Sequence, residues 1–186
     1  MGMPLAHRRF TVDEYHRMGD AGVFHEDDHV ELIEGQIVEM TPIGPEHAAG
    51  VDRVKRALAR RVDDRAVVRV QDPVRLDRLA EPQPDIALLR PPIERYAHAH
   101  PAPGDLWLVI EVADTPREYD RSVKLPLYAR ASADTARPLR DSVTRLALSV
   151  TSRPSVDCIL AVGPLRRDVR ARHRQVFPRL LRQGRP

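Results

Sequence analysis

Apolar residues recur at regular intervals over roughly residues 10 to 131, and these intervals predict alternating helices and strands. Between residues 46 and 62 they are spaced by three or four, as on one face of a helix: Ala48, Val51, Val54, Leu58 and Val62. In "FTVDEYHRMG", Thr11 followed three residues later by Glu14 is typical of a helix start with a capping box. "HVELIEGQIVEM" predicts two short strands joined at Glu34 and Gly35.

Three further segments are strand-like. "AVVRVQDPVRL" reads as an extended segment broken at Pro73, and residues 86 to 89 form a short apolar strand entered through Pro82 and Pro84. Residues 106 to 110 are all apolar and lead into Glu111 and Val112, which indicates a buried strand with a carboxylate near its end. A helix is expected to follow, from about residue 117 to 131.

Composition restricts the class of protein but does not indicate a function. A chain of 186 residues suits one domain, here with a tail. The single cysteine, Cys158, excludes an internal disulfide framework and fits a cytoplasmic protein. No apolar run reaches the ~18 residues of a membrane span, so no membrane partner is expected. The eight histidines show no spacing typical of metal ligands, and "HAH" at residues 98 to 100 is expected at the surface.

The net charge of +3 is the sum of two regions whose net charges have opposite signs. Residues 131 to 186 hold twelve Arg, no Lys, four Asp and no Glu, a balance of +8, whereas the preceding residues hold eighteen basic and twenty-three acidic side chains, a balance of −5. We therefore divide the chain into a domain over residues 1–131 and an Arg-rich tail over residues 132–186.

Two carboxylates mark the candidate chemistry. Asp85 stands at the start of one apolar strand, and Glu111 lies toward the end of the next strand along the chain. Consecutive strands are usually neighbours in space, so these acids can converge. A buried carboxylate needs a compensating cation, and a divalent ion such as Mg²⁺ prefers oxygen ligands. Lys124, on the following helix, could fold back over the same point.

At these residues the sequence resembles the Uma2 family of restriction-endonuclease-like proteins, within the PD-(D/E)xK nuclease superfamily. The resemblance rests on "EPQPDIALLRP" and "LWLVIEVADTPREYDRSVKLPLYARA", and it also covers "FTVDEYHRM", "VELIEGQIVEMTPIGPEHA" and "VQDPVRLD", all in family order over residues 10 to 131. It implies an α/β fold, with a restriction-endonuclease-like core in which helices flank a central mixed β-sheet. It also implies Mg²⁺- or Mn²⁺-dependent hydrolysis of DNA phosphodiester bonds.

The resemblance implies a role for individual residues. Pro84 and Asp85 match the "PD" of the motif, and Glu111 matches its second acid. Ala113 stands where the motif lysine is expected, and Lys124 takes its place on the next helix. Asp85, Glu111 and the backbone carbonyl of Val112 would then hold the metal. Glu31 would join the catalytic group, with His47 as an accessory residue.

The same residues fit a mechanism for phosphodiester hydrolysis. The metal would activate water, and Lys124 would stabilise the charged phosphate or orient the attacking water. The basic side chains of the helix over residues 46 to 62 would contact the DNA backbone: Arg53, Lys55, Arg56, Arg60 and Arg61. DNA is thus the expected partner. A homodimer would allow paired cuts in a duplex, and no small-molecule cofactor is expected.

Each residue also has a simpler interpretation. Glu111 could face solvent or pair with Arg117, and Asp85 could cap the turn after proline. Lys124 could be a solvated helix lysine, and alternation along "HVELIEG" could place Glu31 on a strand surface. His47 could be structural, and the arginines near it could be a solvated helix face.

The chain departs from the family after "YARA", where a further core strand containing Trp is replaced by "SADTARPLRDSVTRLALSV". Residues 132–186 are either a shifted reading frame in GC-rich DNA or a divergent, disordered basic tail that binds nucleic acid. "VDCILAVG" is their only strand-like piece. Loss of the family strand would leave an incomplete core with an unpaired strand edge. Three functions follow: an active endonuclease, an inactive nuclease-like protein that binds DNA, or a non-functional truncated remnant.

Overall fold

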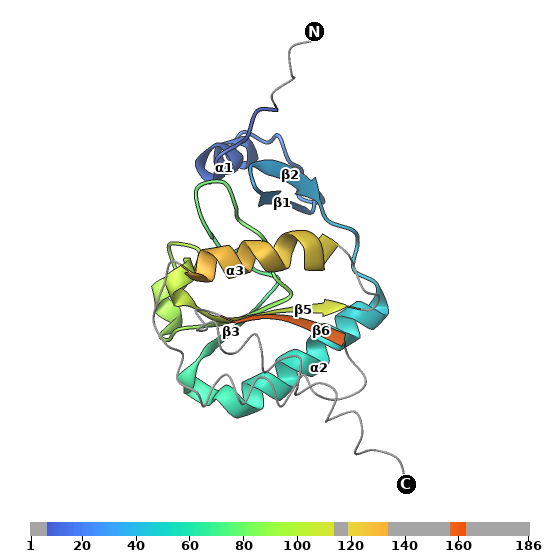
Figure 1. Cartoon of the computed structure of the whole chain (residues 1–186), viewed down its shortest axis with the longest axis vertical. Helices are drawn as coiled ribbons and strands as arrows, with labels where there is room; N and C mark the ends of the chain where they lie inside the picture. Colours follow the sequence, from blue (N-terminus) through green and yellow to red (C-terminus); the bar gives the residue numbers. More distant parts are fainter. Residues whose placement is uncertain (1–6, 114–118, 134–156, 163–186) are drawn as a thin grey trace.

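A four-stranded antiparallel sheet, flanked by a helix on each face, forms the centre of the molecule in the computed structural model, which describes residues 7–113, 119–133 and 157–162 (Figure 1). The sheet order is β3-β4-β5-β6, and a separate hairpin pairs β1 with β2. The strands are β1 Val30–Ile33, β2 Gln36–Glu39, β3 Val67–Val70, β4 Ile86–Leu89, β5 Leu106–Ala113 and β6 Asp157–Val162.

The helical elements follow the predicted order. The α-helices are α1 Val12–Asp20, α2 Pro45–Val62 and α3 Leu125–Ala133. Short turns of 3₁₀-helix are η1 Asp63–Arg65, η2 Ile93–Tyr96 and η3 Pro103–Asp105, and the π-helical turn η4 Asp120–Lys124 leads into α3. Within the described ranges, no helix has the length and apolar composition to cross a membrane.

The α/β class with flanking helices is confirmed. All the strand pairs in the described part of the chain are antiparallel, so the parallel pair that a mixed sheet would require is not among them. In Figure 1, α2 lies against one face of the sheet and α3 against the other, while α1 and the β1-β2 hairpin lie beyond α3.

Local signals explain the N-terminal elements. The Thr11 hydroxyl accepts a hydrogen bond from the Glu14 backbone, and the Glu14 carboxylate accepts one from the Thr11 backbone, so the predicted capping box is confirmed. Glu34 and Gly35 form the turn of the predicted hairpin, with φ values of 51° and 80°. A two-residue hairpin turn of this type needs positive φ at both positions. A Cβ on Gly35 would also lie 2.6 Å from Arg9 Cβ.

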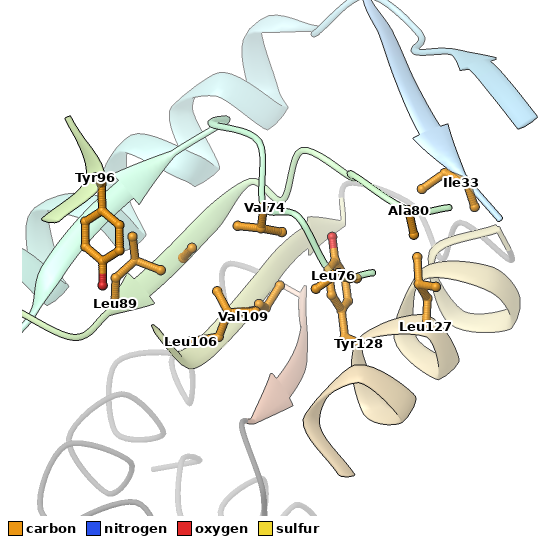
Figure 2. Close-up of a cluster of buried hydrophobic side chains, with 11 residues drawn as sticks. Ile33, Val74, Leu76, Ala80, Leu89, Tyr96, Leu106, Val109, Leu127 and Tyr128 are labelled. Atoms are coloured by element: carbon orange, nitrogen blue, oxygen red, sulfur yellow. The ribbon is translucent and has the colours of Figure 1, made fainter. Parts of the chain in front are cut away.

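Alternation along β4 divides the core in two. Ile86 and Leu88 face α2, and Ala87 and Leu89 face α3. The first group joins the apolar stripe of α2: Val51, Val54, Leu58 and Val62. The second cluster is drawn in Figure 2, where Leu127 and Tyr128 extend from α3 toward the loop residues Leu76 and Ala80. The side of the sheet that a residue faces is therefore set by whether its position is odd or even along β4.

The C-terminal prediction is corrected in one respect. β6, which is the strand-like piece noted in the tail, pairs antiparallel with β5 from Leu108↔Val162 to Ala113↔Asp157. The edge of β5 is paired, so the prediction of an unpaired edge is wrong for this strand. The shifted-frame and disordered-tail hypotheses concern residues 134–156 and 163–186, which lie outside the described residues.

Candidate active site

Asp85 and Glu111 lie at the same end of the central sheet because β4 and β5 run antiparallel. Ile86, the first residue of β4, pairs with Ile110 near the end of β5. Asp85, just before β4, therefore lies next to Glu111, which follows Ile110 on β5. Side chains alternate along a strand, so both acids fall on the face that α3 covers.

The two acids are held by reciprocal hydrogen bonds between side chain and backbone. The Asp85 backbone N–H donates to Glu111 Oε2 over 3.1 Å, and the Val112 N–H donates to Asp85 Oδ2 over 2.8 Å. The N–H and C=O of one strand residue point toward the same neighbour, so the Val112 carbonyl is expected on the Asp85 side of β5. The two carboxylates are fixed by the strands themselves.

His47 contacts Asp85 from the first turn of α2. Its Nε2 lies 2.9 Å from Asp85 Oδ1, and only 10% of the His47 side chain is exposed. A carboxylate can only accept, so Nε2 carries the proton in this contact. Pro45 at the first position of α2 begins the helix and brings His47 to the end of the sheet.

Lys124 and Glu31 complete the group. Lys124 Nζ lies 3.0 Å from Glu31 Oε1 and 3.9 Å from Glu111 Oε1. Glu31 is 1% exposed and Lys124 is 7% exposed, so the interpretations of a surface strand residue and a solvated helix lysine are wrong. Glu111, 6% exposed, does not face solvent either, and its suggested partner Arg117 lies outside the described residues.

Two further residues belong to the site and were not found from the sequence. The Tyr128 hydroxyl donates to Glu111 Oε1 over 2.9 Å. Gln83 holds Glu31, because its backbone N–H donates to Glu31 Oε2 over 3.1 Å, while its amide donates to the Val30 carbonyl over 3.2 Å. Tyr128 follows Lys124 by four residues, and this one-turn spacing was the signal available for it.

The electrostatics of the site favour a cation. Burial, opposed by Lys124 and reinforced by Asp85, raises the pKa of Glu111 from 4.5 to about 8. Burial and then the charge of Glu111 raise the pKa of Tyr128 well above 10. The carboxylates of Glu31 and Glu111 thus share one lysine ammonium, and Asp85 lies beside Glu111. Carboxylate oxygens have about two lone pairs each, so those already accepting hydrogen bonds can also coordinate an ion.

The fold and this group define an α/β protein in which acidic side chains from neighbouring strands lie at one end of the sheet. Residues 12–135 match the model of the Uma2 family, described as "Putative restriction endonuclease", and this match covers more than half of the chain. The chain belongs to the Uma2 family. No curated protein matches it.

Proposed function

We propose that this protein is a Mg²⁺- or Mn²⁺-dependent endonuclease that hydrolyses phosphodiester bonds of DNA. The observation that carries the proposal is the pair Asp85 and Glu111. The Asp85 N–H donates to the Glu111 carboxylate, the Val112 N–H donates to the Asp85 carboxylate, and the buried ammonium of Lys124 lies beside Glu111. Family membership supports a nuclease of the restriction-endonuclease type.

The donor set suits a hard divalent ion. Asp85 and Glu111 offer oxygen ligands, and the carbonyl of Val112 would add a third from the same end of β5. When bound, such an ion supplies Lewis-acid chemistry, since it lowers the pKa of water and offsets negative charge on phosphate. The raised pKa of Glu111 means that a positive ion nearby would favour its ionised form.

The protein's own side chains would stabilise negative charge and position the catalytic groups. Lys124 would hold its ammonium against the phosphate oxygens, or orient the attacking water, where negative charge develops. Glu31 would position that ammonium through its 3.0 Å contact, and Gln83 would in turn fix Glu31. His47 would keep the Asp85 carboxylate oriented, and Tyr128 would do the same for Glu111.

DNA would lie along α2. Arg53, Lys55, Arg56 and Arg60 are exposed on this helix, and the first turn of the same helix carries His47 into the site. Basic side chains in such a row contact phosphates without reading sequence. Cleavage of both strands at one position would need two sites, so the active form is proposed to be a homodimer.

A plasmid-nicking assay tests the proposal. Wild type and Asp27→Ala, which changes an exposed acid away from the site, should nick supercoiled DNA with Mg²⁺ or Mn²⁺, and Asp85→Ala should not. EDTA should stop the reaction. Cleavage that survives Asp85→Ala or excess EDTA would refute the mechanism. DNA binding by wild type with no metal-dependent nicking would instead identify an inactive nuclease-like binding protein.

A further inference from the structure

A second group of potential metal ligands lies outside the proposed active site. His16 of α1, Glu81 and His100 each offer one ligand atom, and the three atoms lie within 4.8 Å of one another. The His16 and His100 rings are 6.0 Å apart between centroids and nearly perpendicular, at 72°. These residues are distant in the sequence, and histidine spacing gave no sign of the group.

Glu81 is the fixed member of this cluster. Its backbone N–H donates to the Leu32 carbonyl over 2.8 Å, which forms a β-bridge beside the hairpin, and the residue is 3% exposed. One carboxylate oxygen, Oε1, lies 2.5 Å from His16 Nε2. The other oxygen, Oε2, is buried and has no hydrogen-bond partner among the residues that the structure describes.

The buried Oε2 atom of Glu81 points to a missing partner. A buried carboxylate oxygen without a donor is costly, and native proteins usually satisfy such a group with protein, water or an ion. His16 and His100 are partly or fully exposed, so both rings can turn toward an ion from the solvent side. The cluster therefore combines a fixed, buried acid with two adjustable imidazoles.

We propose that His16, Glu81 and His100 form a Zn²⁺ site. Two imidazole nitrogens and one carboxylate oxygen are a common zinc set, with a fourth position for water. At zinc bond lengths, tetrahedral ligand atoms lie roughly 3.4 Å apart, so the ligands need move only a little. Mg²⁺ prefers oxygen ligands, and it is therefore a poor competitor for a site with two imidazoles.

The ion would connect three separate segments. It would tie α1 to the loop between η2 and η3, and both to the segment that continues from Glu81 through Gln83 to Asp85. The site does not depend on the proposed nuclease reaction, since no residue is shared with it. Its expected effect is structural: Zn²⁺ raises the temperature of thermal unfolding.

Metal titration of the full-length protein tests the site. Wild type should bind one Zn²⁺, measured by competition with a chromophoric chelator, and the same stoichiometry should hold in an Asp85→Ala background. His16→Ala, His100→Ala and Glu81→Gln should each weaken this binding at least about tenfold, as removal of even a supporting residue does. His98→Ala is the matched control, because His98 is an exposed histidine of the same loop that lies outside the cluster.

Co²⁺ supplies an independent reading of the ligand set. The wild type and His98→Ala should show visible absorption of a nitrogen- and oxygen-ligated ion, and the three ligand variants should lose it while they keep the circular dichroism of the folded protein. Excess Mg²⁺ should leave the Zn²⁺ affinity unchanged. Equal Zn²⁺ affinity in wild type and the ligand variants, or no detectable Zn²⁺ binding by the wild type, overturns the proposal.

Discussion

Lys124 Nζ, at the end of η4, lies 3.0 Å from Glu31 Oε1 on β1, and both residues are buried. Glu111 Oε1 lies 3.9 Å from the same ammonium. When no divalent ion is bound, the lysine therefore compensates Glu31, and it compensates Glu111 wherever that group is ionised. Removal of the lysine should affect both folding and catalysis. Thermal unfolding measures the first effect, and nicking activity measures the second.

Lys124→Met should lower the free energy of unfolding by about 3 kcal/mol in EDTA, because it leaves buried carboxylates without their cation. Mg²⁺ should restore part of this loss, so the rise in melting temperature on adding Mg²⁺ should be larger in Lys124→Met than in wild type. Thermal unfolding with and without Mg²⁺ measures both effects. Nicking activity should stay lost in either condition.

Lys55→Met is the matched control, since Lys55 is the other lysine of the chain and is exposed on α2. It should unfold like the wild type and respond to Mg²⁺ as the wild type does. An equal Mg²⁺ response in wild type and Lys124→Met would contradict the idea that lysine and metal compensate the same acids.

Stability should depend on pH through Glu111. Its pKa is about 8 in the folded chain, whereas the ordinary pKa of a glutamate is 4.5, so between these values the folded state keeps a proton that the unfolded state releases. The free energy of unfolding contributed by this group is fully present below pH 4.5 and is lost as pH rises through about 8. Denaturant unfolding in EDTA across this range measures it.

Glu111→Gln removes this titration and should flatten the stability profile, with its largest gain over wild type at the alkaline end. The wild type and Glu111→Gln should differ least at acidic pH, where the Glu111 carboxyl is already neutral. Parallel profiles for the two proteins would show that Glu111 titrates normally.

Tyr128→Phe keeps the ring in the core but removes the hydroxyl that donates to Glu111. The free energy of unfolding should fall by about 1 to 2 kcal/mol, as expected for one buried hydrogen bond to a carboxyl group. Nicking should slow without disappearing, because Asp85 and Lys124 remain. A Tyr96→Phe variant, which removes the hydroxyl that donates to the Arg90 carbonyl, is a control for stability without an effect at the site. Equal nicking rates for wild type and Tyr128→Phe would contradict a role for this hydroxyl.

DNA binding should become less dependent on salt when the α2 cations are removed. The double variant Arg53→Gln, Arg60→Gln removes two exposed charges, so the slope of log affinity against log salt should decrease by about 0.9 for each phosphate that is no longer neutralised. Fluorescence anisotropy with a labelled duplex, repeated over a range of salt, measures the slope. Arg17→Gln on α1 should leave it unchanged, and an unchanged slope in the double variant would remove α2 from the DNA-binding surface.

The elements with strong local signals could be predicted from the sequence. The Thr11–Glu14 capping box, the turn at Glu34 and Gly35 and the apolar residues 86 to 89 each depend on neighbours in the chain. The extended segment around Pro73 was only partly correct, because the strand β3 is confined to Val67–Val70. Pairing between strands that are far apart in the sequence, by contrast, cannot be predicted from local patterns. The pairing of β6 with β5 is an example.

The proximity of the candidate site residues could be predicted from the sequence, but their burial could not. Order along the chain pointed to Asp85, Glu111 and Lys124, and the family resemblance added Glu31 and His47. The structure brings these five together. Glu31 was ambiguous because alternation assumes one solvated strand face. In the fold, the segment carrying Glu81 and Gln83 runs beside β1 and encloses Glu31, which no local pattern could indicate.

The proposed catalytic metal site at Asp85 and Glu111 is tested most directly by a crystal soaked in Mn²⁺ and measured for anomalous scattering. We expect a peak between the carboxylates of Asp85 and Glu111, about 2.0 to 2.5 Å from their oxygens, as is usual for a hard divalent ion. An ordered site in which both carboxylates are well defined and no peak lies between them, at saturating Mn²⁺, would contradict the proposal that these two acids bind the catalytic ion.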